Sequence, residues 1–375
     1  MTVRLGAVGL GGLGSIELEL YDEMDDVEVV AGADVSEEAR EEFAATSDAP
    51  TYERHDEMLA AHDLDAVSIV TPHTLHYEQA MDCFAAGADV FLEKPMVTGV
   101  ENAVSLVAAA DEQGRILQVG YQRHFDPLFR ELKRVVSSGR IGDVHAVNAY
   151  LGQDWIALQR GTWRTAPDLS GGGQLYDSGS HLLDALLWTL DAEPRRVAAV
   201  TDDRGEEVDV NSALAVTLDR DAGVARNGDR EDARDGHSDE DCDGEERLPF
   251  SLVTASVGVV GDGTHGDPDE GIVFWGTEGH VRYDEDRLTV SEEGATYEGE
   301  VSGDRDFLAL TRRKLSDFVR AVEEDSDPAV PGSFGLQVTA LTEAAYEAAE
   351  TGRTVDVQAR IAEAQTEANA AVADD

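Results

Sequence analysis

Lys94 is the residue whose position in the chain most directly suggests chemistry. The 375 residues include only three lysines, Lys94, Lys133 and Lys314. Because lysine is so scarce, a lysine at the end of a buried apolar run indicates a specific role and not a solvated surface position. That run, residues 88–92, reads as a parallel strand, and open α/β sheets bind ligands at the carboxyl ends of such strands. Pro95 follows and is a candidate for a cis peptide bond. We expect an ammonium group in a binding cleft; the alternative is a surface ion pair between Glu93 and Lys94.

A second group of reactive side chains lies in the segment GGGQLYDSGSH, residues 171–181. Asp177 and His181 are four residues apart, so a helix that begins by Asp177 would present both on one face, about one turn apart. A histidine beside a carboxylate can donate and accept a proton near neutral pH. The alternative is that Asp177 caps the helix and His181 is a core histidine.

A glycine-rich turn near the N-terminus has the spacing that a dinucleotide requires. Gly9, Gly11 and Gly14 follow a short apolar strand and precede a helical segment, in the pattern G-x-G-x-x-G. Gly9 permits the tight turn, Gly11 lets the backbone approach a pyrophosphate, and Gly14 lets the helix pack closely on the strand. The amides at the start of the helix would then face the phosphates.

Asp34 bears on which dinucleotide is bound. It ends a second apolar run, about 20 residues beyond Gly14, where the pattern places an acid for the ribose hydroxyls. A carboxylate there repels a 2′-phosphate, so NAD is favoured over NADP, although Arg40 could soften the repulsion. The alternative is that Asp34 caps the helix that begins near Ser36.

The elements that must position these residues alternate between strand and helix in the first third of the chain. Apolar runs typical of strands end before Asp34, Thr71, Glu93 and Gly120, and amphipathic segments follow the first three. This alternation predicts an α/β fold with a doubly wound parallel sheet. We place this first domain at residues 1–120.

The pattern of apolar and polar residues changes from Tyr121 onwards. Short alternating segments without helices between them predict a second, α+β domain with a mostly antiparallel sheet, over residues 121–355. Residues 221–247 are charged and poor in large apolar groups, and we interpret them as an acidic, mobile insert. Residues 356–375 are expected to form an acidic C-terminal tail.

The composition limits the possible partners. The formal net charge is −49, from 78 acidic and 29 basic residues, which is typical of a folded surface adapted to high salt. Such a surface disfavours nucleic acid and anionic membranes. No apolar run is long enough to span a membrane and no secretion leader is evident, so we expect a cytoplasmic protein.

Neither the cysteines nor the histidines indicate a metal site. Cys83 lies in an apolar helical stretch and Cys242 in the acidic insert, so they do not form a disulfide framework. His73 and His76 are three residues apart, but no third ligand is in view, and we expect no metal.

Several of these segments, taken in order, resemble the Gfo/Idh/MocA family of oxidoreductases. The resemblance covers the chain to about Val355 and is carried by GLGGLG at 9–14, VTPHTLHYEQA at 70–80, EKP at 93–95, GYQRHFDP at 120–127, Trp163-Arg164, and GGGQLYDSGSHLLD at 171–184. The sequence departs from the family at two positions: His73 replaces a common asparagine, and His124 replaces a common arginine.

The resemblance implies a Rossmann domain followed by a domain whose open sheet forms a dimer or tetramer interface. It implies that Lys94, Asp177 and His181 form the catalytic group, with His181 as general acid and base. The implied cofactor-binding residues are Gly9, Gly11, Gly12, Leu13, Gly14, Asp34, Thr71, Pro72, His76, Glu93, Lys94 and Gln122. The implied substrate-binding residues are Lys94, Arg123, Trp163, Arg164, Asp177 and His181.

These inferences predict an NAD(P)-dependent dehydrogenase that acts on a hydroxyl group of a sugar, inositol or related polyol. Two alternatives stay open. One is a non-catalytic regulator that binds a dinucleotide and a partner protein, and the other is an enzyme that keeps NAD tightly bound while it interconverts or cleaves sugars. The sequence does not name the substrate.

Overall fold

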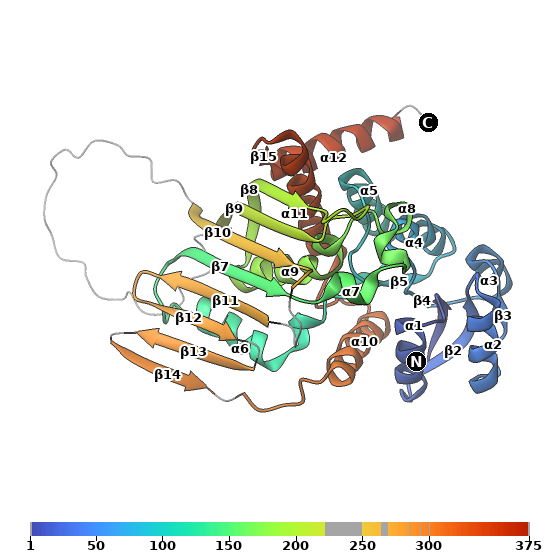
Figure 1. The fold of residues 1–375 in the computed structure, drawn as a ribbon. Helices are drawn as coiled ribbons and strands as arrows, with labels where there is room; N and C mark the ends of the chain where they lie inside the picture. The colour runs from blue at the N-terminus through green and yellow to red at the C-terminus, as the bar shows by residue number, and fades with distance from the viewer. Residues whose placement is uncertain are drawn as a thin grey trace, which may run out of the picture.

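The computed structural model describes residues 2–221, 250–263, 269–284, 286–292, 294–299 and 301–373. The chain builds two sheets, which lie at opposite sides of the ribbon in Figure 1 with helices between and around them. Most of the expected insert and Cys242 lie outside the described residues.

The first sheet has six parallel strands in the order β3-β2-β1-β4-β5-β6. This order and the alternation with helices confirm the doubly wound fold predicted from the sequence. The strands are β1 (Val3–Val8), β2 (Val27–Ala33), β3 (Thr51–Tyr52), β4 (Ala66–Ile69), β5 (Asp89–Leu92) and β6 (Leu117–Val119). The helices are α1 (Leu13–Asp22), α2 (Glu37–Thr46), α3 (His55–Ala61), η1 (His73–Leu75), α4 (His76–Ala85) and α5 (Val100–Gln113).

The second sheet has nine strands in the order β14-β13-β12-β11-β7-β10-β9-β8-β15. Within the described strands of this second sheet, only the β7–β10 pair is parallel, so the predicted mostly antiparallel sheet is confirmed. The strands are β7 (Val144–Gly152), β8 (Ala192–Asp202), β9 (Asn211–Asp221), β10 (Phe250–Val260), β11 (Asp269–Gly276), β12 (Gly279–Asp284), β13 (Arg287–Glu292), β14 (Ala295–Gly299) and β15 (Val355–Asp356).

The helices of the second half cover one face of this sheet and leave the other exposed. α6, α9, α11 and α12 contact its strands. On the outer face, Tyr150, Val200, Leu252 and Trp275 are 37–70% exposed. The helical segments are η2 (Gln122–Phe125), α6 (Pro127–Ser137), α7 (Trp155–Gln159), η3 (Trp163–Thr165), α8 (Pro167–Ser170), η4 (Leu175–Gly179), α9 (Ser180–Leu190), α10 (Phe307–Glu324), α11 (Gly332–Thr351) and α12 (Val357–Ala373).

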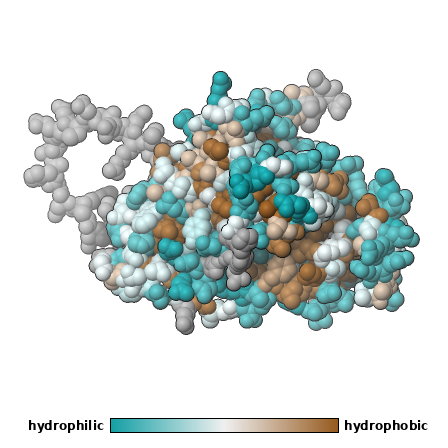
Figure 2. Space-filling model, in the orientation of Figure 1, coloured by the Kyte–Doolittle hydropathy of each residue, from teal (hydrophilic) through white to brown (hydrophobic). Residues whose placement is uncertain are grey.

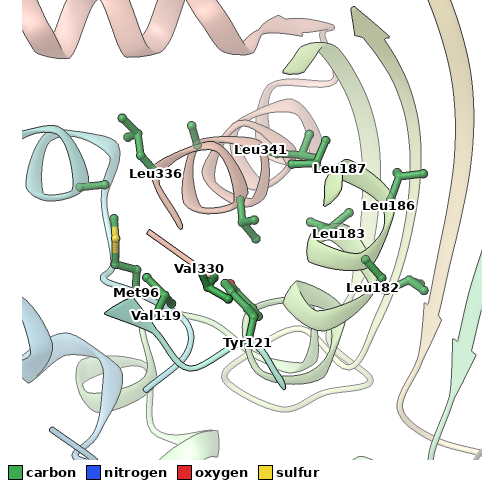
Figure 3. Close-up of a cluster of buried hydrophobic side chains, with 14 of the residues drawn as sticks. Met96, Val119, Tyr121, Leu182, Leu183, Leu186, Leu187, Val330, Leu336 and Leu341 are labelled. Atoms are coloured by element: carbon green, nitrogen blue, oxygen red, sulfur yellow. The ribbon is translucent and has the colours of Figure 1, made fainter. Parts of the chain in front are cut away.

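The C-terminal helices join the two halves. α10 contacts α1 and β1, and its Leu315, Phe318 and Val319 are buried among side chains of the first sheet. α11 packs between α5 and β8, and residues 357–373, expected as a tail, form helix α12, which contacts α5 and β8. Figure 3 shows the shared core, in which Val330 and Tyr121 lie between Met96 and Val119 on one side and the leucines of α9 on the other. This continuous core fixes the carboxyl edge of the first sheet against the second half.

Candidate functional site

A cleft of about 750 Å³ follows the carboxyl ends of the first sheet's strands. It runs past the residues after β1 (Gly9, Gly11, Gly12, Leu13), β2 (Asp34, Val35), β4 (Val70, Thr71, Pro72) and β5 (Glu93, Lys94). This is the edge at which doubly wound sheets bind ligands, because the order of the strands reverses within the sheet and leaves a crevice between the connections.

The glycine turn is built as the spacing predicts. A Cβ on Gly9, whose φ is 92°, would lie 2.3 Å from the Val70 carbonyl oxygen, and a Cβ on Gly14 would lie 2.0 Å from the Gly9 oxygen. Gly14 therefore packs against the turn and does not line the cleft. A Cβ on Gly11 would meet only Ala39 Cβ, at 3.7 Å, so this position is open on the cleft side. Helix α1 then begins at Leu13, with its first amides at the cleft.

Asp34 ends β2 inside the cleft. Its carboxylate accepts hydrogen bonds from the backbone N–H groups of Leu10 (2.8 Å) and Ser36 (2.8 Å), which tie it to the glycine turn. The cap of α2 is Ser36, whose hydroxyl accepts from Ala39 N–H, so the alternative in which Asp34 caps that helix does not hold. Arg40 donates to the Asp34 carbonyl oxygen at 2.6 Å and so lies at the same strand end.

Lys94 and Asp177 come from different halves of the molecule and form an ion pair. Lys94 follows β5, and its Nζ lies 3.0 Å from Asp177 Oδ1 and 3.1 Å from the Asp177 carbonyl oxygen. The two side chains are 15% and 9% exposed, so the pair is largely removed from water. This geometry excludes the surface pair of Glu93 with Lys94.

Asp177 keeps its negative charge although it is buried. Trp155 Nε1 donates to its Oδ2 at 2.8 Å, and Arg164 Nε lies 3.3 Å from the same oxygen. Burial alone would raise the pKa of Asp177, but the charges of Lys94 and Arg164 and the Trp155 hydrogen bond outweigh it and hold the pKa below 3.8. Asp177 lies in the π-helical turn η4, before α9, and makes no helix cap.

His181 is the second residue of α9 and lies, half-buried, on the wall of a second cavity of about 430 Å³. Lys94, Asp177 and Arg164 line the same cavity. Burial lowers the pKa of His181 well below 6.5, and the nearby charges of Lys94 and Arg123 lower it further. The imidazole is therefore neutral at physiological pH, and its place on the cavity wall leaves it accessible to accept a proton.

Glu93 supports this region from behind. Its carboxylate accepts from the Lys94 backbone N–H at 3.2 Å and pairs with the fully buried Lys314 of α10. Lys314 also lies 2.9 Å from Glu17 of α1. Burial opposes the charged form of Glu93, but Lys314 outweighs it and lowers the pKa of Glu93. The same burial raises the pKa of Glu17 to about 8.

The structure separates the other candidate residues into three places. Thr71, Pro72 and Trp163 line the dinucleotide cleft, and Arg164 lies where it meets the second cavity. Gln122, expected at the cofactor, lines the second cavity instead, together with Arg123. His76 lies behind the cleft and is fully buried: its ring contacts the backbone oxygens of Thr71, Pro95 and Met96, so it holds the cis Lys94–Pro95 turn.

His73 takes a place in the cleft, buried between Trp163 and His76. Burial lowers its pKa to about 3, so it is neutral. Within the described part of the chain, no group of three His, Cys, Asp or Glu side chains is arranged to hold a metal ion. No described helix is long and apolar enough to cross a membrane.

Sequence reasoning missed two residues of the site. Trp155 on α7 holds Asp177, and Glu270 on β11 lies 2.7 Å from Arg123 in the second cavity. Both belong to segments with no recognisable motif, and both reach the site only through the folding of the second sheet. No local pattern in the sequence could have identified them.

The residues fit a nicotinamide dinucleotide. Because the glycines carry no side chains, the turn leaves space for a phosphate beside the α1 amides. Asp34 lies at one end of the cleft, and Lys94 lies at the other. At the Lys94 end the cleft meets a polar cavity with a neutral histidine. A cofactor and a small polar molecule could thus meet beside an ammonium group and a proton acceptor.

Comparison with known proteins gives matches over both halves of the chain. A family model described as "Oxidoreductase family, NAD-binding Rossmann fold" matches residues 3–121, and a model described as "GFO/IDH/MocA C-terminal domain" matches residues 129–228. The chain is 27% identical over 367 residues to D-xylose 1-dehydrogenase [NADP(+)] of Haloarcula marismortui, which covers 94% of this chain and 92% of that protein.

A shorter match links the chain to scyllo-inositol 2-dehydrogenase (NADP(+)) of Bacillus subtilis. The identity is 30% over 222 residues, or 58% of this chain and 60% of that protein. Among solved structures, the aldose-aldose oxidoreductase of Caulobacter crescentus superposes with a TM-score of 0.75 at 22% identity, covering 95% of this chain and all of that one. This structural likeness supports the fold described above.

Proposed function

The chain belongs to the GFO/IDH/MocA family of oxidoreductases, and from that premise we propose that it is an NAD(P)-dependent dehydrogenase acting on a CH–OH group of a sugar, inositol or related polyol. The names of the matched relatives support this class of substrate, since one acts on D-xylose and another on scyllo-inositol. The observation that carries the proposal is that Lys94 and His181, from separate halves, line one cavity beside the dinucleotide cleft.

In the proposed reaction, the side chains of this protein handle the proton and the developing charge. When bound, the nicotinamide supplies the acceptor for the hydride that leaves the carbinol carbon. His181, which is neutral, accepts the hydroxyl proton. The Lys94 ammonium stabilises the negative charge that grows on the oxygen, and it is held for this task by Asp177. In the reverse direction His181 returns the proton.

The dinucleotide itself is proposed to be held by the glycine turn, the α1 amides and Asp34. The Asp34 carboxylate in the cleft supports a preference for NAD, because it would repel a 2′-phosphate. Arg40 lies at the same strand end and Arg54 lines the cleft, and the charge of either could instead favour NADP. The matched relatives that carry NADP(+) in their names make a direct comparison of the two cofactors necessary.

We extend the proposal to assembly and location. The exposed Tyr150, Leu252 and Trp275 on the outer face of the second sheet support a homodimer or homotetramer through that face. Hydrophilic residues, teal in Figure 2, cover much of the visible face between brown apolar patches. The need for a soluble dinucleotide and the formal net charge of −49 support a cytoplasmic protein that works in concentrated salt.

The test is to offer NAD and NADP separately, in molar KCl, with D-xylose, D-glucose, myo-inositol and scyllo-inositol, and to follow reduced nicotinamide by absorbance. We expect turnover with at least one polyol and tighter binding of NAD than of NADP. Dinucleotide binding without turnover on any of them would favour a regulator. Cofactor that copurifies with the protein, with no net release of NADH, would favour an enzyme that keeps NAD bound.

A further inference from the structure

The basic side chains of the second cavity are all held by carboxylates. Asp177 lies against both Lys94 (3.0 Å) and Arg164 (3.3 Å), as described above. The third cation, Arg123, has a carboxylate of its own: its Nη2 donates to Glu270 Oε2 at 2.7 Å. Of the described residues that line this cavity, none offers a cation without such a partner.

Arg123 is engaged on three sides. Besides its bond to Glu270, its Nη1 donates to the His181 carbonyl oxygen at 2.9 Å, and its guanidinium plane lies over the ring of Phe129, 5.1 Å from the centroid. The side chains of Arg123 and Glu270 are each 13% exposed, so the pair is only slightly screened by water. The two guanidinium Nη groups with which Arg123 could bind a carboxylate or phosphate are therefore already hydrogen-bonded within the protein.

The remaining polar lining of the cavity is uncharged. It consists of the neutral His181 together with Gln122, Gln153, Gln159 and Ser178. An amide side chain offers both a donor and an acceptor, and so does a hydroxyl. These groups match the hydroxyls of a sugar or a cyclitol, each of which donates one hydrogen bond and accepts others.

We propose that Glu270 is a specificity-determining residue, which neutralises Arg123 so that the cavity takes an uncharged polyol and rejects the corresponding acid or phosphate ester. This inference rests on the proposed function, because it concerns the substrate of the same site. An anionic group near Arg123 meets the negative charge of Glu270 and finds no free guanidinium edge. Removal of that charge leaves a buried guanidinium with an unmet preference for an anion.

The test compares matched pairs of sugars on the wild-type protein and on E270Q, with NADH bound for binding measurements and with the preferred oxidised cofactor for kinetics. The pairs are D-glucose with D-glucuronate and D-galactose with D-galacturonate, which differ only in a hydroxymethyl or carboxylate group. We expect the wild type to bind each neutral sugar at least tenfold more tightly than its acid. In E270Q that preference should fall at least tenfold, through tighter binding and a lower KM for the acid.

Two variants make this result specific. E292Q is the matched control, because Glu292 also pairs with an arginine of the second half, Arg140, but does not line the cavity. The E292Q variant should prefer neutral sugars over acids to the same degree as the wild type. E270D keeps a carboxylate and should keep most of the preference for neutral sugars, which separates loss of charge from loss of packing.

The possible outcomes separate this inference from the proposed function. Equal binding of sugar and acid by the wild type, binding of neither, or an unchanged preference in E270Q would each overturn the role of Glu270. Retained discrimination in binding, without turnover of any sugar or polyol, would instead contradict the proposed dehydrogenase activity and leave the role of Glu270 intact.

Discussion

The protonation state of His181 follows from its burial and from the charges around it. Burial is the main cause of the lowered pKa of His181, and the charges of Lys94 and Arg123 disfavour a protonated imidazole further. Asp177 works against them, but its charge is already shared between Lys94 and Arg164. Asp177 therefore offsets only part of the lowering, and His181 stays neutral and available as the base of the proposed reaction.

This arrangement predicts the pH dependence of polyol oxidation. The reaction needs neutral His181, and because the pKa of this residue is lowered, kcat/KM should stay near its plateau as the pH falls through 6.5 and decline only well below it. The measurement is kcat/KM against pH at constant ionic strength, with circular dichroism at each pH to exclude unfolding. An acid limb with its midpoint at 6.5 or above would contradict the environment that we describe for this residue.

At the residue scale, the sequence could identify the groups that lie in motifs but not those that support them. Lys94, Asp177 and His181 stand in segments with recognisable spacing. Trp155 and Glu270 do not, because their roles arise from contacts 22 and 147 residues away in the chain. The family resemblance implied that Gln122 binds the cofactor; the short turn η2 places it on the second cavity, which shares Lys94 and Arg164 with the dinucleotide cleft.

At the scale of elements, the glycine turn combines two requirements that the sequence pattern does not separate. Gly14 is needed by the fold, since a Cβ there would lie 2.0 Å from a backbone oxygen, whereas Gly11 has room for a Cβ in the structure. A residue at position 11 would therefore hinder only the approach of a pyrophosphate to the backbone.

Two alanine substitutions test this division. G11A should leave the free energy of unfolding within roughly 0.5 kcal/mol of the wild type, as for a substitution without clashes, and should weaken NADH binding at least tenfold. G14A should destabilise the protein by about 2 kcal/mol or more, because its Cβ can be accommodated only by a backbone shift. Thermal unfolding and titration of NADH fluorescence measure the two effects. Tight NADH binding by G11A would show that Gly11 does not face the cofactor.

The regular elements followed from hydrophobic patterning, and the irregular ones did not. The strands before Gly9, Asp34, Thr71 and Glu93 were visible as apolar runs, whereas the two-residue strand β3 is too short to carry a pattern. A helix was expected from about Ser178 to Leu190; the structure has helix α9 from Ser180, preceded by the π-helical turn η4, which contains Asp177. That turn presents Asp177 to Lys94, and it depends on tertiary contacts that the local sequence does not encode.

At the scale of the whole molecule, the two halves are joined by helices that the sequence could not assign to a partner. The sequence shows that α10 has an apolar face. It does not show that this face packs on α1 and β1, or that the helix brings Lys314 to Glu93. The core of Figure 3 likewise draws on both halves. This shared core keeps Lys94 and His181 at one site, although 86 residues of sequence separate them.

The excess of acidic residues predicts that stability depends on salt. With a formal net charge of −49, self-repulsion is strong in dilute buffer and is screened when the Debye length shrinks to about 3 Å at 1 M salt. We expect Tm to rise by more than about 10 °C between dilute and molar KCl, which corresponds to about 8 kcal/mol for a chain of this size. Sucrose, which stabilises without screening, serves as the control. An unchanged Tm in dilute buffer would contradict this expectation.

The most direct test of the account is the activity of K94A and H181A on the best polyol substrate, measured beside their affinity for NADH. We predict that each variant binds NADH within a few-fold of the wild type but that its kcat falls roughly 10²- to 10⁴-fold. H145N, which changes an exposed histidine on β7 outside both cavities, should match the wild type. Undiminished turnover in K94A and H181A would contradict the claim that these two residues carry the reaction.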